Sequence, residues 1–364
     1  MNDTALAALR LQASGLVLRK QVELVRALGD AQQVLAASGE AWRECCAALT
    51  PADLAALTAA ARIDIGDTLD ELARLQVEVV ALGTAEYPPL LAQIDDPPAL
   101  LHIRGAFAKA DELSVAIVGT RECTTYGEHV TERLAGSLAR RGFTIVSGLA
   151  VGIDAAAHRA ALEAGGRSIG VMACGVDVDY PKSNRELRER MVGSGVVVSE
   201  MPLHTTPRRE VFPQRNRIVS GLSLGTLIVE APVKSGALIT ANLALDQGRE
   251  VFAVPGDIGS PTSRGCHALI KDGARLVESA EDVIDGLGML LQAVPERKRP
   301  ATVVADLSTD EQAIVTELSA GPRQLDQLVI GTGLPPARVS AALMLLEVKQ
   351  VIKRLTGGAF ARVA

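Results

Sequence analysis

Apolar positions in the first 82 residues recur at the spacing of a helix. Apolar side chains stand at i, i+3 and i+4 in stretches separated by glycine or by Thr-Pro, and this spacing predicts short helices. The stretches are 5–11, 22–28, 31–37 and 69–75. Short helices with glycine between them occur in helix-hairpin-helix or sterile-alpha-motif (SAM)-like DNA modules and equally in plain packing bundles. Both interpretations of an all-α domain at residues 1–83 therefore stay open.

After Ser114 the pattern changes to short β-branched runs that alternate with helical stretches. The runs are apolar on both faces, which is typical of parallel strands buried between helices. They are Val115–Val118, Thr144–Val146, Ser168–Met172, Val196–Ser199, Thr226–Val229 and Glu250–Val254. The alternation predicts an α/β domain at residues 84–292, and such sheets bind ligands in the loops at the carboxyl ends of their strands.

Prolines and charged residues mark the two ends of this domain. Four prolines hold residues 87–105 extended and interrupt any helix, so we expect an entry linker packed onto the sheet domain. Residues 293–306 are charged and punctuated by proline, and we expect a second linker there.

The last stretch, residues 307–364, predicts a winged helix. Ser308 and Glu311 form a capping box, in which each side chain can bond the other's free backbone amide. Helical stretches follow at 324–332 and 336–347, and Gly357-Gly358 separates two β-prone runs as a hairpin turn would. Three helices and a terminal hairpin are the parts of a winged helix.

Composition limits where a functional site can lie. The chain has 364 residues, 48% of them hydrophobic and 22% charged, with a net charge of −6, which is typical of a globular protein in several domains. Because the chain is not basic overall, any anion site must be local. The start lacks a secretion signal and no run of about 18 apolar residues occurs, so we expect a cytoplasmic protein. The five cysteines show no C-x-x-C spacing, and we expect neither disulfides nor a metal.

Two glycine turns follow the first two strands. Gly119, Thr120 and Arg121 form a turn whose backbone amides and guanidinium suit a phosphate. The turn lacks G-x-G-x-x-G, which argues against NAD, and we expect no cofactor. Ser147 and Gly148 make a second turn of small residues that enters a helix.

A possible acid/base or metal pair lies just beyond the second turn. Asp154 and His158 stand four residues apart near the start of the predicted helix. We favour a structural role for both, since an aspartate suits the first turn of a helix.

A cluster of arginines surrounds one aromatic ring in TTPRREVFPQRNRIVSG. Four arginines stand against the single acid Glu210, with Phe212 among them. Guanidinium groups suit phosphates and a ring can stack on a base, so the cluster favours single-stranded nucleic acid, with a solvated basic loop as the alternative. Asn216 adds a group that can reach a phosphate or a base edge.

The next strand brings Glu230 and Lys234 to the same edge of the sheet. Lys234-Ser235-Gly236 lacks the order of a P-loop, which argues against an NTPase. Glu230 is the carboxylate here that could act as a hydrolytic base or nucleophile, so an enzyme remains an alternative.

Taken together, these motifs resemble the DNA-processing protein A (DprA, or Smf) family. The matching runs are VAIVGTRECTTYG, IVSGLAVGIDAAAHRAAL, ACGVDVDYP, FPQRNRIVSGLS, VEAPVKSGALITA and REVFAVPGDIGSPTSRGCHALIKDGA, which span roughly residues 87–277. The resemblance implies a non-enzymatic, homodimeric protein whose extended Rossmann-like domain binds single-stranded DNA. It further implies protection of incoming single strands in natural transformation and help in loading the recombinase RecA.

The resemblance also implies roles for particular residues. Residues at the matching positions would contact DNA, with Phe212 as the base-stacking ring. They are Gly119, Thr120, Arg121, Ser147, Gly148, Arg209, Phe212, Arg215, Asn216, Arg217 and Lys234. Val151 and Gln214 occupy positions where many relatives carry a basic residue, so affinity could be lower or come from other residues.

Two other functions stay open. A phosphoribohydrolase-like enzyme would use Glu230 with Arg217 or Arg121 on a nucleoside monophosphate, but of that group's P-G-G-x-G-T run only Gly-Thr is kept here. A winged-helix regulator would use Lys349, Lys353 and Arg354 on duplex DNA.

Overall fold

The computed structural model describes residues 2–288, 307–318, 321, 323–348, 351–354 and 359–362. The chain forms two compact units, Met1–Val294 and Pro295–Ala364. The predicted linker at 293–306 lies outside the described residues, and so do Lys349 and Gly357-Gly358.

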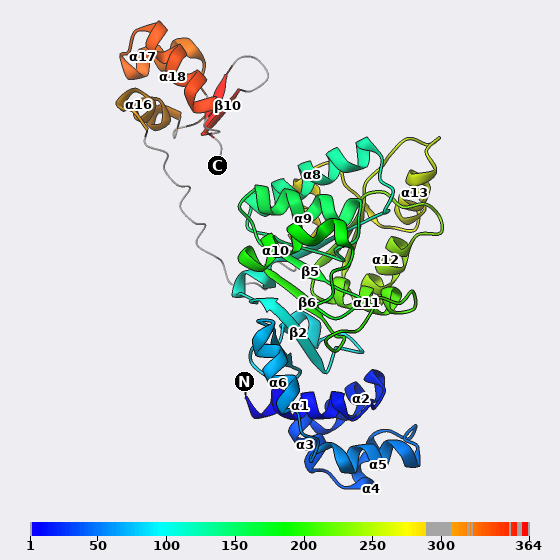
Figure 1. Ribbon diagram of the computed structural model, residues 1–364. Coiled ribbons are helices and arrows are strands. Elements are labelled where there is room, and N and C mark those ends of the chain that lie inside the picture. Colours follow the sequence, from blue (N-terminus) through cyan, green and yellow to red (C-terminus); the bar gives the residue numbers. More distant parts are fainter. Residues whose placement is uncertain are drawn as a thin grey trace. The chain divides into compact units, whose positions relative to one another are not determined.

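A nine-stranded sheet organises the first unit (Figure 1). Its strand order is β1-β2-β6-β5-β4-β3-β7-β8-β9. The strands are β1 (Glu78–Ala81), β2 (Leu100–Gly105), β3 (Ser114–Val118), β4 (Thr144–Ser147), β5 (Ser168–Val171), β6 (Val196–Ser199), β7 (Gly225–Ile228), β8 (Glu250–Ala253) and β9 (Arg275–Leu276). β3 to β9 pair in parallel, and the six predicted strands are confirmed to within one residue at each end.

Two segments at the β1 edge of the sheet differ from the prediction. Residues 78–81, assigned to the helical region, form β1, and the expected entry linker contains the short helix α7 (Pro89–Ala92) and strand β2. Pro89 is tolerated because it stands in the first turn of α7, where amides have no helical partner. β2 pairs antiparallel with both β1 and β6, so the sheet is mixed although mostly parallel.

Helices cover both faces of the sheet. The helices that follow β3 to β9 in the first unit are α8 (Thr125–Arg140), α9 (Ile153–Glu163), α10 (Arg185–Ser194), α11 (Val211–Gly221), α12 (Gly236–Asp246), α13 (Arg264–Lys271) and α14 (Ala280–Gly286). The same unit has the 3-10 turns η1 (Lys109–Glu112), η2 (Lys182–Asn184) and η3 (Pro261–Ser263). Side chains alternate along β3: Val115 and Ile117 face a core with α8, α9 and α14. Ala116 and Val118 face a second core with α10, α11 and α12.

Six helices precede the sheet. They are α1 (Asp3–Ala13), α2 (Leu18–Leu28), α3 (Ala31–Ala36), α4 (Gly39–Cys45), α5 (Pro51–Ala60) and α6 (Gly66–Arg74). The four predicted helical stretches fall in α1, α2, α3 and α6. Apolar residues of these helices belong to the same core cluster as Ala116 and Val118 of β3. The boundary drawn at residue 83 stays a prediction.

One carboxylate in these helices predicts an acid-sensitive contact. Lys20 Nζ lies 2.7 Å from Asp53 Oδ2. The hydrogen bond from Lys20, with those from Thr50, lowers the pKa of Asp53 to about 2. A depressed carboxyl pKa stabilises the fold above the unfolded value of 3.8, and that stabilisation is lost as pH falls to about 2. We expect Asp53→Asn to lower the thermal midpoint at neutral pH and to leave it almost equal to that of the wild type near pH 2. The exposed Asp70→Asn should leave the thermal midpoint unchanged at both pH values. A deficit independent of pH would contradict the assignment.

The second unit is small and helical. It contains α16 (Thr309–Leu318), α17 (Leu325–Thr332), α18 (Pro336–Val348) and an antiparallel pair, β10 (Ile352–Arg354) and β11 (Phe360–Arg362). The Ser308 capping box is confirmed, with Ser308 N donating to Glu311 Oε2 at 2.7 Å and Glu311 N donating to Ser308 Oγ at 3.3 Å. Three helices around one core, followed by a hairpin, confirm the winged-helix prediction.

In the part of the chain that the structure describes, no single helix is long and apolar enough to cross a membrane. The helices at 325–332 and 336–347 together reach the required length and hydropathy, but they meet at 112°.

Candidate nucleic-acid interface

A pocket of about 330 Å³ opens at the carboxyl edge of the sheet, where the strand order reverses around β3. β3 pairs with β4 on one side and β7 on the other, so the loops that follow these strands diverge and leave a crevice. The pocket is lined by residues 119–122, Gly148, Pro232, Lys234 and Ser235, together with one face of α11 and the start of α12.

The turn after β3 requires glycine because it packs against two neighbours. A Cβ at Gly119 would stand 2.5 Å from Ile153 Cγ1 and 2.9 Å from Glu230 O. The next amide is already bonded, since Thr120 N donates to Glu230 O at 2.8 Å. The expectation that all amides of residues 119–121 are available to a phosphate is therefore wrong for Thr120.

Glu230 fastens this turn to its neighbours. Its carboxylate accepts hydrogen bonds from Thr124 N at 2.9 Å, from Thr124 Oγ1 at 2.7 Å and from Thr262 Oγ1 at 3.0 Å. The side chain is buried and is not among the residues that line the pocket. These hydrogen bonds give Glu230 a structural role, and they do not support the alternative of a hydrolase.

Two buried charged side chains, Asp154 and Arg215, form hydrogen bonds with the turn after β4. Gly148 N donates to Asp154 Oδ2 at 3.1 Å, and Arg215 Nη1 donates to Gly148 O at 2.6 Å and also to Val171 O. Burial lowers the pKa of Arg215 to about 10, with Asp154 acting in the opposite direction. A Cβ at Gly148 would stand 2.4 Å from Arg215 Nη2, so any other residue here would have to displace the Arg215 guanidinium.

Helix α11 presents one face to the pocket. Phe212, Arg215, Asn216 and Val219 line it, at the i, i+3, i+4 and i+7 positions of a helix. Pro213 fits the first turn, where a missing amide donor costs little. Arg217 is two positions, or about 200°, from Arg215 and therefore belongs to the opposite face.

Arg121 and Phe212 meet at the mouth of the pocket. Arg121 Cζ lies 5.0 Å from the centroid of the Phe212 ring, a cation–π contact. The ring of Tyr180 lies 5.9 Å from the same ring, tilted by 60°. The sequence prediction that Arg121 and Phe212 lie together is confirmed, whereas Tyr180 was not predicted for the site.

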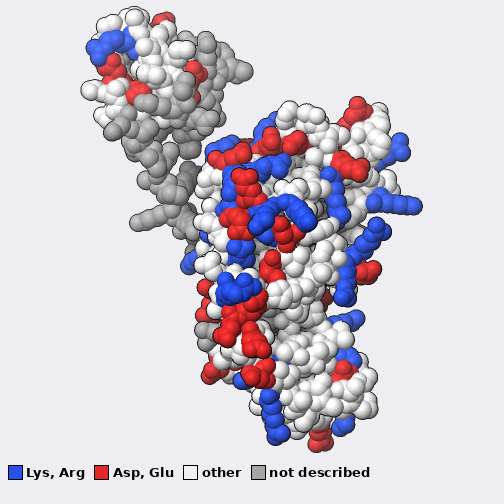
Figure 2. Space-filling view, viewed as in Figure 1, with Lys and Arg blue, Asp and Glu red and all other residues white. Residues whose placement is uncertain are grey.

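The pocket is locally positive although the chain is acidic. Its lining includes Arg121, Arg215 and Lys234 against the carboxylates of Glu122 and Asp154. The N-terminus of α12 adds partial positive charge, because the first turn of a helix has unpaired amides. Elsewhere charge is mixed: Figure 2 shows basic and acidic side chains interleaved on the face that carries α9 and α10.

Eight of the eleven predicted contact residues line the pocket. They are Gly119, Thr120, Arg121, Gly148, Phe212, Arg215, Asn216 and Lys234. The other three lie elsewhere: Ser147 is buried and donates to Ile117 O at 2.6 Å, Arg209 is exposed ahead of α11, and Arg217 is buried on the far face of α11.

The two departures from the family pattern lie at the margin of the site. Val151 is 38% exposed and lines a smaller hollow of about 50 Å³, which shares Arg121 and Phe212 with the pocket. Gln214 is exposed and lines neither hollow.

Asp154 and His158 do not form a catalytic or metal pair. His158 is fully buried, its Nδ1 lies 2.7 Å from Ser168 Oγ, and burial lowers its pKa to about 3, so it is neutral at neutral pH. Among the described residues, no three His, Cys, Asp or Glu side chains are grouped as metal ligands would be. The structural interpretation of both residues fits these contacts.

The fold and the site define a class: a Rossmann-like α/β protein with a basic, aromatic-edged pocket at its topological switch point, joined to a winged helix. The family model of DNA recombination-mediator protein A matches residues 78–288, and that of the DprA winged helix domain matches residues 298–358. The chain therefore belongs to the DprA/Smf family of DNA recombination mediators, which are generally non-catalytic.

Similar proteins come from several bacteria. DNA processing protein DprA of Bacillus subtilis is 44% identical over 58% of this chain and 71% of its own. Protein Smf of Escherichia coli is 39% identical over 75% and 74% of the two chains. The match to the DprA protein of Mycobacterium tuberculosis spans 63% of that protein.

Two solved structures share the fold. DNA processing protein A of Streptococcus pneumoniae superposes with a TM-score of 0.69, 34% identity and coverage of 78% of this chain and 98% of that one. The protein of Helicobacter pylori, described with its single-stranded DNA binding mode, gives a TM-score of 0.53 at 31% identity over 60% and 97% of the chains.

Proposed function

We propose that the pocket around Arg121 and Phe212 binds single-stranded DNA. The observation that carries the proposal is the contact between these two side chains beside Lys234 and the start of α12. A single strand offers phosphates and unpaired bases together, and this edge of the sheet offers cations and a ring together. The single-stranded DNA binding described for the Helicobacter pylori relative supports the same assignment.

Binding requires a small rearrangement at the mouth. The Arg121 guanidinium covers the Phe212 ring, so a base that stacks on that face displaces it. The displaced guanidinium is then available to the adjoining phosphate. Because Thr120 N and Gly148 N are already bonded, phosphate binding depends more on side chains than on backbone amides.

The wider role rests on the family resemblance. We propose that the chain protects incoming single strands and helps to load RecA on them, as a homodimer, in natural transformation or recombination. The family of DNA recombination mediators to which the chain belongs supports this role at the level of the whole protein.

A comparison of single- and double-stranded DNA tests the pocket through Phe212. We expect a labelled oligo-dT strand to bind more tightly than a duplex, with log affinity falling against log salt by about 0.7 for each phosphate contact. Phe212→Ala should weaken single-strand binding about tenfold, since base–aromatic stacking is worth about 1–3 kcal/mol, and leave duplex binding nearly unchanged. Fluorescence anisotropy across a salt series measures both.

Phe107→Ala is the matched control for Phe212→Ala. Phe107 is half-buried and lines a separate cleft with Tyr87 and Pro88. Its loss should leave both affinities unchanged. Equal affinity of the wild-type protein for single strands and duplex, or indifference to Phe212→Ala, would overturn the assignment.

A further inference from the structure

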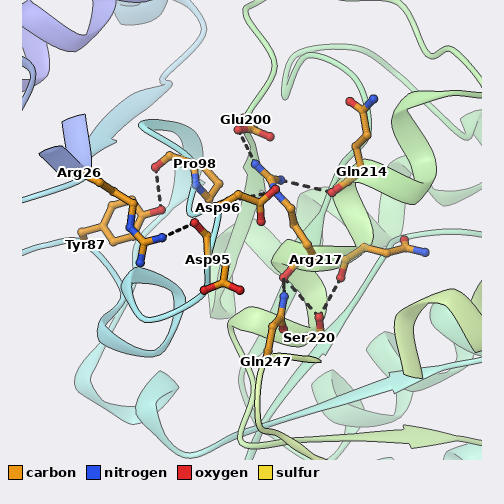
Figure 3. Close-up of polar contacts among 11 residues, drawn as sticks. Arg26, Tyr87, Asp95, Asp96, Pro98, Glu200, Gln214, Arg217, Ser220 and Gln247 are labelled. Atoms are coloured by element: carbon orange, nitrogen blue, oxygen red, sulfur yellow. Dashed lines mark hydrogen bonds and ion pairs between the residues drawn. The ribbon is translucent and has the colours of Figure 1, made fainter. Parts of the chain in front are cut away.

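Arg217 stands on the far face of the pocket helix, in a polar cluster between α11 and the 95–98 turn (Figure 3). Its Nη2 donates to Glu200 Oε1 at 2.7 Å, and its Nε lies 3.0 Å from both the carbonyl and the carboxylate oxygen of Asp96. The Arg217 side chain is 11% exposed and that of Glu200 is 6% exposed.

The groups that hold Arg217 also contact the N-terminal helices. Glu200 O accepts a hydrogen bond from Gln12 Nε2 of α1 at 3.2 Å. The carbonyl of Asp95, next to Asp96, accepts from Arg26 of α2. Arg217 is thus one contact away from α1 through Glu200 and one contact away from α2 through the 95–96 turn.

Two further hydrogen bonds fix this cluster from its other sides. Tyr87 Oη donates to Pro98 O at 2.8 Å and anchors the end of the turn. Gln247 Nε2, at the end of α12, donates to Arg217 O at 3.0 Å. The middle of α11 is therefore fixed to the 95–98 turn, to α12 and, through single contacts, to α1 and α2.

Position and charge both separate Arg217 from the DNA pocket. Phe212 and Arg215 face the pocket, and Arg217 does not line it. Burial alone would lower the pKa of Arg217, but Glu200 and Asp96 outweigh burial and raise it. Its charge is therefore matched by two carboxylates rather than offered to a phosphate.

We propose that Arg217 is a positioning residue: it ties α11, and with it Phe212 and Arg215, to the 95–98 turn and the N-terminal helices, and it does not contact DNA. This inference rests on the proposed single-strand binding. Through these contacts of Arg217, the packing of the N-terminal helices affects the geometry of the pocket.

The two roles predict opposite effects of a change at Glu200. Were Arg217 a phosphate contact restrained by Glu200, Glu200→Gln would release a cation and raise the affinity. With Arg217 as a positioning residue, the same change loosens α11 and lowers the affinity.

The experiment measures anisotropy of a fluorescein-labelled oligo-dT strand of about 20 nucleotides with the full chain, from about 50 to 200 mM salt. We expect Arg217→Met to lower the affinity about tenfold with an unchanged salt slope, and Glu200→Gln to lower it about fivefold. The double variant should be no weaker than Arg217→Met, because both changes break one contact. A slope reduced by about 0.7 in Arg217→Met, or a Glu200→Gln variant that binds as well as the wild type or better, would overturn the proposal.

Two comparisons separate this inference from general destabilisation and from the proposed function. Arg167 Nε and Asp111 Oδ1 form another ion pair, 2.8 Å apart, outside the pocket, so Arg167→Met should lower the thermal midpoint without changing the affinity. If Arg167→Met lost as much affinity as Arg217→Met, the effect of Arg217 on binding would be explained by general destabilisation. If Arg217→Met fails to fold, the sign of the Glu200→Gln effect decides. A wild-type chain that does not bind the strand defeats the proposed function as well, whereas binding with the wrong Glu200→Gln sign defeats this inference alone.

Discussion

Arg121→Ala is expected to weaken single-strand binding by about 10- to 100-fold. A charge-assisted hydrogen bond to a phosphate contributes about 1.5–3 kcal/mol, and the guanidinium is exposed beside the pocket, where DNA can reach it. Because one phosphate contact disappears, the log–log salt slope should also fall by about 0.7. Stability should change little, since the Phe212 ring keeps its contact with Tyr180. Anisotropy titrations at several salt concentrations give both the affinity and the slope.

Arg190→Ala is the charge-matched control for this change. Arg190 is an exposed residue of α10 that does not line the pocket, and its loss alters the net charge by the same amount. We expect its affinity and salt slope to equal those of the wild type. Equal losses in the two variants would mean that the overall field, and not the pocket, attracts DNA.

The sheet could be predicted from sequence because its signal is local. Each buried parallel strand is a short β-branched run, so the bounds of β3 to β8 agree with the prediction to within one residue. β1 and β2 were missed for different reasons. The run that forms β1 directly follows a stretch with helical periodicity. The prolines before β2 indicate a linker, and the place of β2 in the sheet becomes clear only from its antiparallel pairing with β6.

The site was predictable as a set of residues and less so as a geometry. Glycine turns and an arginine cluster point to the right edge of the sheet, but a count of basic residues does not tell which of them share a face. Reading residues 211–221 as a helix would have put Phe212, Arg215 and Asn216 on one face and Arg217 on the other. Tyr180 and the bonded amide of Thr120 depend on tertiary contacts that no local pattern records.

Asp154→Ala is expected to lower the stability of the first unit by about 1–3 kcal/mol, because it leaves the buried Gly148 amide without its acceptor and removes the charge that offsets the burial of Arg215. Asp154 is 6% exposed, its pKa is raised by burial against the pull of Arg215, and Oδ2 accepts from Gly148 N. Without that acceptor the turn after β4 loses its support, so single-strand affinity should also fall. Thermal and urea midpoints report the stability, and anisotropy below the transition reports the binding.

The double variant Asp154→Leu/Arg215→Met separates two effects: the loss of stability from an uncompensated Arg215 charge, and the loss of DNA binding from the missing contacts of Arg215. When both charges are removed together, no buried ion remains uncompensated, so the double variant should be more stable than Asp154→Ala. Single-strand binding should nevertheless stay weak, since Arg215 no longer holds the Gly148 and Val171 carbonyls beneath the pocket. The exposed Asp272→Ala should alter neither quantity. The single variants Asp154→Leu and Arg215→Met complete the comparison. If their losses of stability added up to that of the double variant, the two charges would be uncoupled, and Arg215 would be held in place by its carbonyl contacts alone.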